Sequence, residues 1–191
     1  MQDMVGERSF DYLVVGAGSA GCVLANRLSE SGRDSVLVLE AGGRDNNLLL
    51  HMPTAFSLAM NLPRFNWGYL SEPEPGLDGR RIKQARGKVI GGSSAINGMV
   101  YVRGHAGDFD AWAQAGAEGW SFAEVLPYFR RAESFAGGDA AFRGHDGPLG
   151  ISAGSMRNPL YRAFAEAGRQ AGYGSTEDPN GRQQEGFGPM Q

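Results

Sequence analysis

Three glycines near the N-terminus, Gly16, Gly18 and Gly21, stand between strand-forming residues and a helical pattern. Glycines at this spacing permit a tight reversal and the close approach of a pyrophosphate, whose charge is favoured by the N–H groups and dipole at a helix start. Glu40 follows Gly21 by nineteen residues, where a carboxylate can accept hydrogen bonds from an adenosine ribose and would repel a 2′-phosphate. These residues predict a dinucleotide site that disfavours NADP, with an ordinary βαβ turn as the alternative.

Two strands and one helix must position these residues. Residues 10–15 have the aromatic and β-branched content of a buried strand, and residues 35–39 form a second such run that ends at Glu40. Between the two runs, apolar side chains recur at helical spacing at Ala20, Val23, Leu24 and Leu28. The order of strand, glycine turn, helix and strand predicts an α/β fold with a Rossmann-like βαβ unit in a mixed sheet.

A second glycine-rich element covers residues 86–98 and begins seventy residues after Gly16. Two such loops fit a long ligand that is anchored twice, as FAD is. The first loop would hold the pyrophosphate, and the second would reach toward the ribityl chain and the isoalloxazine. Glycines in the second loop let the backbone approach a ligand, while hydroxyl and basic side chains supply hydrogen bonds and positive charge. The residues concerned are Arg86, Lys88, Gly91, Gly92, Ser93 and Ser94. A glycine-rich connector that binds no ligand is the alternative.

Composition and charge bound the class of protein. The 191 residues are 41% hydrophobic and carry a formal net charge of −3, which predicts a globular chain with no electrostatic reason to bind nucleic acid. The single cysteine, Cys22, excludes an intrachain disulfide and a Cys-rich metal site, and we expect it to pack within the first helix. No metal site is expected.

No part of the sequence has the character of a targeting or membrane-spanning segment. Residues 1–8 are too polar for a signal peptide, and the apolar stretch 48–60 is shorter than the roughly 20 residues that a membrane span needs. We expect that stretch to be a buried or cofactor-facing loop. The cytoplasm is the expected location, with peripheral attachment at the inner membrane as an open alternative.

The second glycine-rich element resembles the first signature of the glucose-methanol-choline (GMC) flavoprotein oxidoreductases. Residues 87–97, with Tyr101, Gly104 and Asp110, fit that signature at every constrained position, and the signature is far more specific than the first glycine motif. Four further segments are similar to the bacterial choline-dehydrogenase-like branch, whose members oxidise alcohols: residues 40–43, 66–69, 72–75 and 119–121. The resemblance covers the chain from its first strand to its end.

The resemblance implies which residues hold FAD. Pyrophosphate contacts would come from Gly16, Gly18, Ser19, Ala20 and Gly21, with Glu40 on the adenosine ribose. The rest of the cofactor would be lined by Val89, Gly91, Gly92, Asn97, Gly98, Met99 and Val100, and the expected set is completed by Ala41, Trp67, Arg86 and Ser93. For Trp67, core packing alone is the alternative. Some relatives attach FAD covalently through a histidine at the position of Ile96, so non-covalent FAD is implied.

The family's catalytic residues have no counterpart in this sequence. Relatives carry a histidine and a second histidine or asparagine near the C-terminus, which act as base and hydrogen-bond partner over flavin N5. This chain ends before that region, so we expect no catalytic residue here and interpret the chain as an N-terminal fragment of a longer enzyme. His51, His105 and His145 match no catalytic position and are expected on the surface or in loops.

The last third of the sequence predicts helices and a domain boundary. Asp108 could cap a short helix, and Ser121 with Glu124 forms a capping-box pattern before an apolar run. Residues 148–152 predict a strand, and a further helix should begin at Asn158-Pro159 and end at Gly172. We place the FAD-binding domain at 1–147 and the truncated start of an α+β substrate-binding domain at 148–191.

Two classes of function remain open. One is an FAD-dependent alcohol dehydrogenase that transfers a hydride from choline or another small primary alcohol to flavin N5 and passes electrons to a quinone, a cytochrome or oxygen. The other is a non-catalytic remnant that binds FAD, another nucleotide or a partner weakly.

Overall fold

The computed structural model describes residues 8–191, and they divide into two compact units. The first unit ends at Met99, and the second is Val100–Gln191. This division differs from the expected domain boundary after residue 147, which stays a prediction. Residues 1–8 were expected to be too polar for a signal peptide. Of these residues, the structure describes only Arg8.

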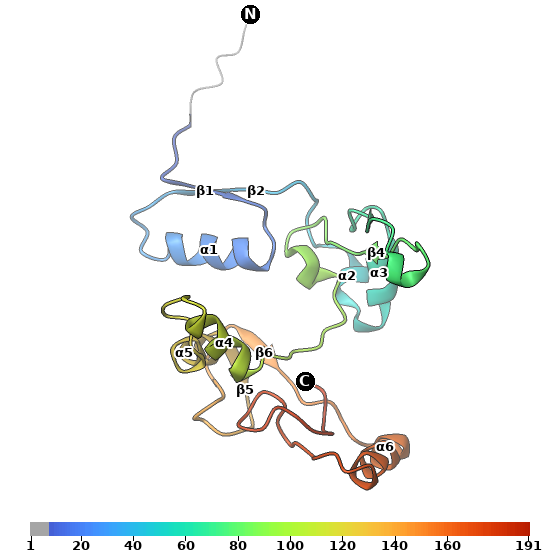
Figure 1. The fold of residues 1–191 in the computed structure, drawn as a ribbon. Helices are drawn as coiled ribbons and strands as arrows, with labels where there is room; N and C mark the ends of the chain where they lie inside the picture. The colour runs from blue at the N-terminus through green and yellow to red at the C-terminus, as the bar shows by residue number, and fades with distance from the viewer. Residues whose placement is uncertain (1–7) are drawn as a thin grey trace, which may run out of the picture. The chain divides into compact units, whose positions relative to one another are not determined.

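The first unit opens with the predicted βαβ unit. Strand β1 (Tyr12–Val15) and strand β2 (Val36–Leu39) run parallel, with Tyr12 opposite Val36 and Val15 opposite Leu39. Helix α1 (Ser19–Ser29) connects them and lies along one face of the pair (Figure 1). The fold class is therefore confirmed at its Rossmann-like core. In the described residues, parallel and antiparallel pairings occur in separate two-stranded sheets rather than in one mixed sheet.

The apolar side chains of this βαβ unit are only partly covered. Val14 is buried, but Leu13 is 63% and Val15 84% exposed, and Val23 and Leu24 of α1 are also exposed. Parallel strands with apolar residues on both faces normally have helices on both sides, and here α1 alone covers β1 and β2. The expected burial of the first strand is therefore wrong for this chain, although its position is right.

The stretch 48–60 is helical and is not the loop expected from the sequence. It contains α2 (Leu48–His51), a short 3₁₀ turn η1 (Pro53–Ala55) and α3 (Phe56–Asn61). The Asn47 side chain accepts a hydrogen bond from Leu49 N at the start of α2. Burial is also uneven, because Ala55 and Ala59 are buried while Leu48 is 70% exposed.

The rest of the first unit places the second glycine loop. Strand β3 (Tyr69–Leu70) pairs antiparallel with β4 (Lys83–Gln84), and the 3₁₀ turn η2 (Pro75–Leu77) lies between them in sequence. A third 3₁₀ turn, η3 (Gly92–Ala95), follows in the glycine loop. Ile96, just after η3, is 3% exposed and packs with Ala59 and Phe65, so the loop ends in a small apolar core.

The second unit starts with two helices that share an aromatic cluster. Helix α4 (Ala106–Gln114) is capped by His105, whose Nδ1 accepts from Gly107 N at 3.1 Å, so the expected cap at Asp108 is wrong. Helix α5 (Phe122–Ala132) begins with the predicted capping box of Ser121 and Glu124. Phe109 of α4 makes edge-on contacts with Trp112 of the same helix and with Phe129 of α5, at ring-centre distances of 5.3 and 5.6 Å.

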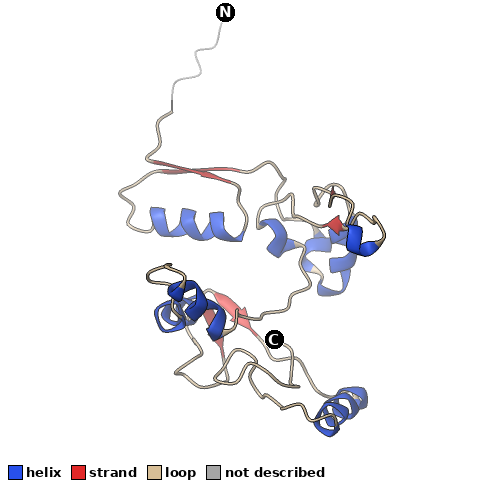
Figure 2. Ribbon diagram, in the orientation of Figure 1, coloured by secondary structure: helices blue, strands red, loops and turns tan. Residues whose placement is uncertain are grey.

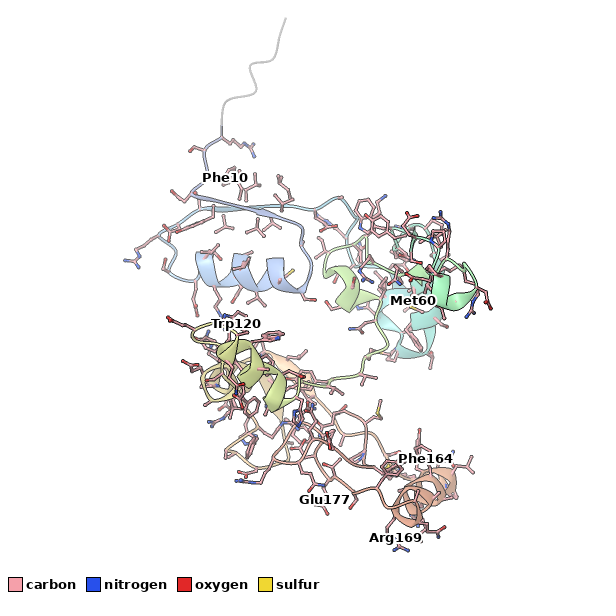
Figure 3. All side chains as sticks on the ribbon, viewed as in Figure 1. Phe10, Met60, Trp120, Phe164, Arg169 and Glu177 are labelled. Atoms are coloured by element: carbon pink, nitrogen blue, oxygen red, sulfur yellow. The ribbon has the colours of Figure 1, made fainter. Side chains whose placement is uncertain are left out.

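The second unit also contains a parallel strand pair and a final helix (Figure 2). Strand β5 (Glu133–Phe135) pairs in parallel with β6 (Leu149–Ile151), which lies in the predicted strand. Helix α6 (Pro159–Gln170) is capped by Asn158, as expected. Phe164 and Arg169 project from different sides of α6 (Figure 3), and Phe164 packs against Phe187 with ring centres 5.0 Å apart.

Candidate dinucleotide site

The first glycine loop makes a reversal that side chains would block. Gly16 has φ +94°, and its N–H donates to the Leu39 carbonyl at 2.7 Å, which ties the loop to β2. A Cβ on Gly21 would overlap the Gly16 carbonyl oxygen, so the loop and the first turn of α1 can be this close only with glycine there. The glycine spacing thus sets the path of the chain from β1 into α1.

The start of α1 is open in the way that an anion site requires. No side chain caps the helix at Gly18, and the first turn has no acidic residue. A Cβ on Gly16 or Gly18 would meet no atom within 4 Å, so the space beside both residues is free. The N–H groups of a first helical turn have no partner within the helix, and with a helix dipole and free space they fit a pyrophosphate. Ser19 and Ala20 belong to this first turn.

Glu40 lies at the end of β2 beside the first loop. Its Oε2 accepts from Ala17 N and its Oε1 from Gly42 N, both at 2.7 Å. The side chain is half-buried, and a carboxylate has lone pairs for further hydrogen bonds. It can therefore accept from a ribose hydroxyl while keeping both backbone contacts.

The second glycine loop lies directly against the first. Gly91 and Gly92 have φ +92° and +58°, and Gly91 N donates to the Ala17 carbonyl at 2.7 Å. A Cβ on Gly92 would come within 2.8 Å of Gly18 Cα. Val89 is fully buried behind this contact. The structure therefore joins the two glycine elements, seventy residues apart in sequence, into a single backbone surface.

The polar side chains of the second loop form hydrogen bonds with backbone atoms of the same loop. Ser93 Oγ accepts from Gly87 N at 3.1 Å, and Ser94 Oγ donates to the Gly91 carbonyl at 2.6 Å. Asn97 Oδ1 accepts from Met99 N at 2.9 Å. Ser93 and Ser94 lie within the four-residue 3₁₀ turn η3. These side chains stabilise the loop, and the backbone forms most of its open surface.

Basic and aromatic side chains lie on one flank of the second loop. Trp67 is 42% exposed and stacks with Tyr69 at 6.0 Å, while Lys88 Nζ lies 4.8 Å from the Trp67 ring centre. Arg86 is exposed, and its guanidinium donates to the Ala85 carbonyl. Asn66, which the sequence did not single out, accepts from Arg86 N at 2.9 Å. Trp67 is thus not a core residue in this chain, contrary to the alternative of core packing.

The remaining expected contacts lie at the edges of the two loops. Ala41 follows Glu40 directly and is exposed, and Gly98 and Met99 are exposed at the end of the first unit. Met99 has φ +57°, an unusual conformation for a side chain of its size. Val100 is exposed and begins the second unit.

The cysteine and the histidines supply no reactive centre at the loops. Cys22 is exposed on α1, where its Sγ lies 3.3 Å from the Ala17 carbonyl oxygen, so the expectation that it packs inside the helix interface is wrong. All three histidines are exposed, as expected. His105 caps α4, and His145 Nδ1 lies 2.6 Å from the Phe135 carbonyl.

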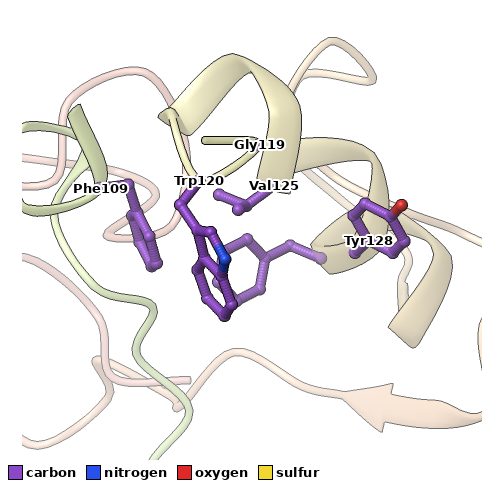
Figure 4. Close-up of a pocket in the computed structure, with 6 residues that line it drawn as sticks. Phe109, Gly119, Trp120, Val125 and Tyr128 are labelled. Carbon is purple, nitrogen blue, oxygen red and sulfur yellow. The ribbon is translucent and has the colours of Figure 1, made fainter. Parts of the chain in front are cut away.

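A separate pocket of about 540 Å³ lies in the second unit between α4 and α5 (Figure 4). Its lining is apolar and aromatic: Phe109, Gly119, Trp120, Val125, Tyr128 and Phe129. None of these side chains is a carboxylate, an imidazole or a thiol. The pocket therefore has apolar surface but no carboxylate or imidazole base.

The second unit also holds a buried carboxylate, Glu133, which is 0% exposed. Arg143 contacts it through two nitrogens at 2.8 and 3.1 Å, and Arg103 Nη2 lies 2.7 Å from its Oε1. Burial raises the pKa of Glu133, but the hydrogen bonds from Arg143 and Gly144 N and the charges of both arginines outweigh it, so the pKa is lowered overall. Glu133 is held ionised and saturated with donors, which suits a structural role rather than proton transfer.

Comparisons with known proteins agree with this geometry. The GMC oxidoreductase N-terminal family profile matches residues 10–191. An oxygen-dependent choline dehydrogenase of Rhizobium etli is 60% identical over 181 residues, which is 95% of this chain and 33% of that protein. The crystal structure of pyridoxine 4-oxidase from Mesorbium loti has a TM-score of 0.85 and 38% identity, covering 93% of this chain and 35% of that one. An FAD-dependent oxidoreductase from Chaetomium thermophilum has a TM-score of 0.81 and 33% identity, covering 90% and 31%.

The parallel β1–α1–β2 unit gives this part of the chain a Rossmann-like α/β fold. The chain belongs to the GMC oxidoreductase family. It spans about a third of the length of the curated relatives it matches. Among residues 8–191, no helix is long and apolar enough to cross a membrane.

Proposed function

We propose that this chain is the cofactor-binding, N-terminal part of an FAD-dependent enzyme that oxidises the CH–OH group of an alcohol. The contact between the two glycine loops, at Gly18 and Gly92 beside the uncapped start of α1, is the observation that supports it most strongly. A surface of backbone N–H groups with a carboxylate at one side suits a dinucleotide better than any smaller anion.

Each part of the chain has one task in this proposal. The N–H groups at the start of α1 bind the pyrophosphate, Glu40 accepts from the adenosine ribose, and the second loop bounds the rest of the cofactor. The chemistry that FAD supplies when bound is acceptance of a hydride at flavin N5. The residues of this chain bind and orient the cofactor. The proton transfer belongs to groups outside these 191 residues.

We further propose that FAD is bound without a covalent link to the protein. Ile96 has no nucleophilic atom, and it is buried against Ala59 and Phe65. FAD should therefore separate from the longer protein on denaturation. Flavin that remains attached to the denatured polypeptide would contradict this part of the proposal.

The proposal places the catalytic base outside these 191 residues. His51, His105 and His145 are exposed and lie away from any expected catalytic position, and a base contributes roughly 10²–10⁴-fold to such a reaction. The isolated chain should show no alcohol oxidation with an artificial electron acceptor beyond that of free FAD. Activity above that level would place a base within this chain.

For the substrate, the proposal ranks choline and other primary alcohols equally. The name of the Rhizobium etli relative supports choline as the substrate. The same name supports oxygen as the electron acceptor, for which a quinone and a cytochrome are the alternatives. We place the protein in the cytoplasm, with peripheral attachment at the inner membrane as a variant of that proposal. Turnover of sugars alone by the longer protein would contradict the substrate class.

A non-catalytic remnant that binds FAD, another nucleotide or a partner weakly is the second candidate function. The downstream reading frame distinguishes the two candidates. A continuous extension with a His–His or His–Asn pair supports the enzyme, and a stop after Gln191 supports the remnant.

A further inference from the structure

Both carboxylate oxygens of Glu40 accept hydrogen bonds from the protein backbone. Oε2 accepts from Ala17 N in the first glycine loop, and Oε1 accepts from Gly42 N in the turn after β2, each at 2.7 Å. A side chain that served only to bind a ribose would not need two charge-assisted bonds to the backbone. Such bonds are short and roughly twice as strong as neutral ones.

The two N–H groups that Glu40 binds belong to segments that both reach the second glycine loop. The Ala17 carbonyl accepts from Gly91 N at 2.7 Å, and the Gly43 carbonyl accepts from Ile90 N at 3.0 Å. The hydrogen bonds therefore form a closed ring through the first loop, the second loop, the turn after β2 and the carboxylate. Glu40 is the one side chain in this ring, and every other member is backbone.

Close packing strengthens the same ring. A Cβ on Gly42 would overlap the peptide between Lys88 and Val89, so the turn after β2 lies directly on the second loop. Val89 is fully buried at this contact. The ring consequently has little room to deform without losing a hydrogen bond.

We infer that Glu40 is a positioning residue that holds the two glycine loops against each other before FAD binds. The inference rests on the proposed function for its consequence in FAD binding, but every member of the ring belongs to the protein. A carboxylate accepts about four hydrogen bonds, so the ring and a ribose contact can coexist. Loss of Glu40 would therefore disturb the second loop, which the side chain does not touch.

Hydrogen exchange of the 191-residue chain without FAD tests the ring directly. Glu40→Gln has one acceptor oxygen, and its NH₂ group would face one of the two N–H donors. The amides of Ala17, Gly42 and Gly91 should exchange about 10- to 100-fold faster in this variant, the change expected for loss of a charged hydrogen bond. Amides of the β1–β2 ladder report whether the unit stays folded.

Two further variants make the test specific. Gly42→Ala breaks the ring at a different point and should release the same Ala17 and Gly91 amides. Asp11→Asn is the matched control, because Asp11 also joins backbone across β1 and β2, accepting from Ser35 N at 2.7 Å at the far end of both strands. It should leave the loop amides unchanged. Unchanged Ala17 and Gly91 exchange in Glu40→Gln or in Gly42→Ala overturns the inference, whether or not the ladder amides also change.

Cofactor titration separates positioning from ribose binding. An FAD analogue without the adenosine ribose hydroxyls should bind Glu40→Gln about tenfold more weakly than it binds the wild-type chain. Equal binding of the analogue by both proteins would reduce Glu40 to a ribose contact and overturn the inference. If FAD binds neither protein, the proposed function fails, and the exchange experiment still decides whether the ring exists.

Discussion

The two units hold their loops together by different kinds of contact. In the first unit, backbone N–H and carbonyl groups of the glycine loops contact one another directly, and Glu40 supplies the one charge among them. In the second unit, the side chains of Glu133, Arg143 and Arg103 form a buried ionic network. The comparison teaches that the surface proposed to bind FAD is kept open because backbone, not side chains, builds it.

The ionic network also reaches the end of the chain. Arg143 Nη1 contacts Asp178 Oδ1 and lies 2.8 Å from Gln191 Oε1, while Asn180 Oδ1 accepts from Arg103 N at 2.7 Å. The irregular segment after α6 is therefore anchored by charges and amides. Phe187 in this segment also packs against Phe164 of α6 and against Tyr173, with ring centres 5.0 and 5.8 Å apart.

The largest expected effect comes from breaking that network. Glu133→Gln removes the carboxylate that pairs with buried Arg103 and leaves Arg143 paired with Asp178. Loss of one partner of a buried ion pair costs about 3–5 kcal/mol. The unfolding free energy of the second unit should fall by that amount. The fluorescence of Trp112 and Trp120 in denaturant measures it in a Trp67→Phe background, because Trp67 belongs to the first unit. Glu166→Gln removes an exposed pair with Arg169 on α6 and is the matched control, with no measurable change expected.

The network should also make stability depend on pH. The folded-state pKa of Glu133 is lowered, so its contribution is fully present above the ordinary glutamate pKa and is lost as the pH falls through the lowered value. The difference in unfolding free energy between wild type and Glu133→Gln should therefore shrink in acid. A difference that stays constant from neutral pH to well below the ordinary glutamate pKa would show that Glu133 does not titrate with folding.

In the first unit, the corresponding test is a substitution that disrupts the close packing of the first glycine loop. Gly21→Ala places a methyl group on the Gly16 carbonyl oxygen, and overpacking of this kind costs about 1–3 kcal/mol. The expected loss exceeds the gain in helix propensity of about 1 kcal/mol from alanine. Hydrogen exchange of the β1–β2 ladder measures it, and a more stable variant would mean that the loop relaxes without strain.

The smallest of these effects concerns a helix cap in the second unit. Ser121→Ala removes the hydroxyl of the capping box with Glu124 and should destabilise α5 by about 1 kcal/mol. Exchange of the first amides of α5 measures the change. Unaltered exchange would mean that Glu124 caps the helix alone.

Features that depend on local sequence were predictable, and contacts between distant charged side chains were not. Both strands of the βαβ unit, the capping box at Ser121 and the cap at Asn158 were predictable, because each depends on neighbouring residues or on glycine spacing. The Glu133–Arg143 pair was not, because neither residue has a local signal that identifies its partner. Asp178 also pairs with Arg143, and their separation of thirty-five residues in sequence makes this contact still harder to predict.

The errors also have physical reasons. The stretch 48–60 has no helical periodicity and contains Pro53, yet the proline begins a 3₁₀ turn that joins two short helices. His105 caps α4 because a ring nitrogen can accept from the backbone as a carboxylate does. Ser93 and Ser94 are a different case: their hydroxyls bond to nearby backbone, which does not contradict a ligand contact, because a hydroxyl can both donate and accept. The contacts proposed for FAD stay predictions.

The most direct measurement is the affinity of the 191-residue chain for FAD with and without a methyl group at Gly18. The backbone there has φ −76° and ψ −174°, which alanine adopts freely, and an added Cβ meets no atom within 4 Å. Gly18→Ala should therefore leave the unfolding midpoint unchanged. If the open backbone beside α1 binds the pyrophosphate, the same methyl group should weaken FAD, measured by flavin fluorescence, by at least about tenfold, or about 1.4 kcal/mol. Equal FAD affinity in the two proteins would contradict the claim that this backbone surface is the cofactor site.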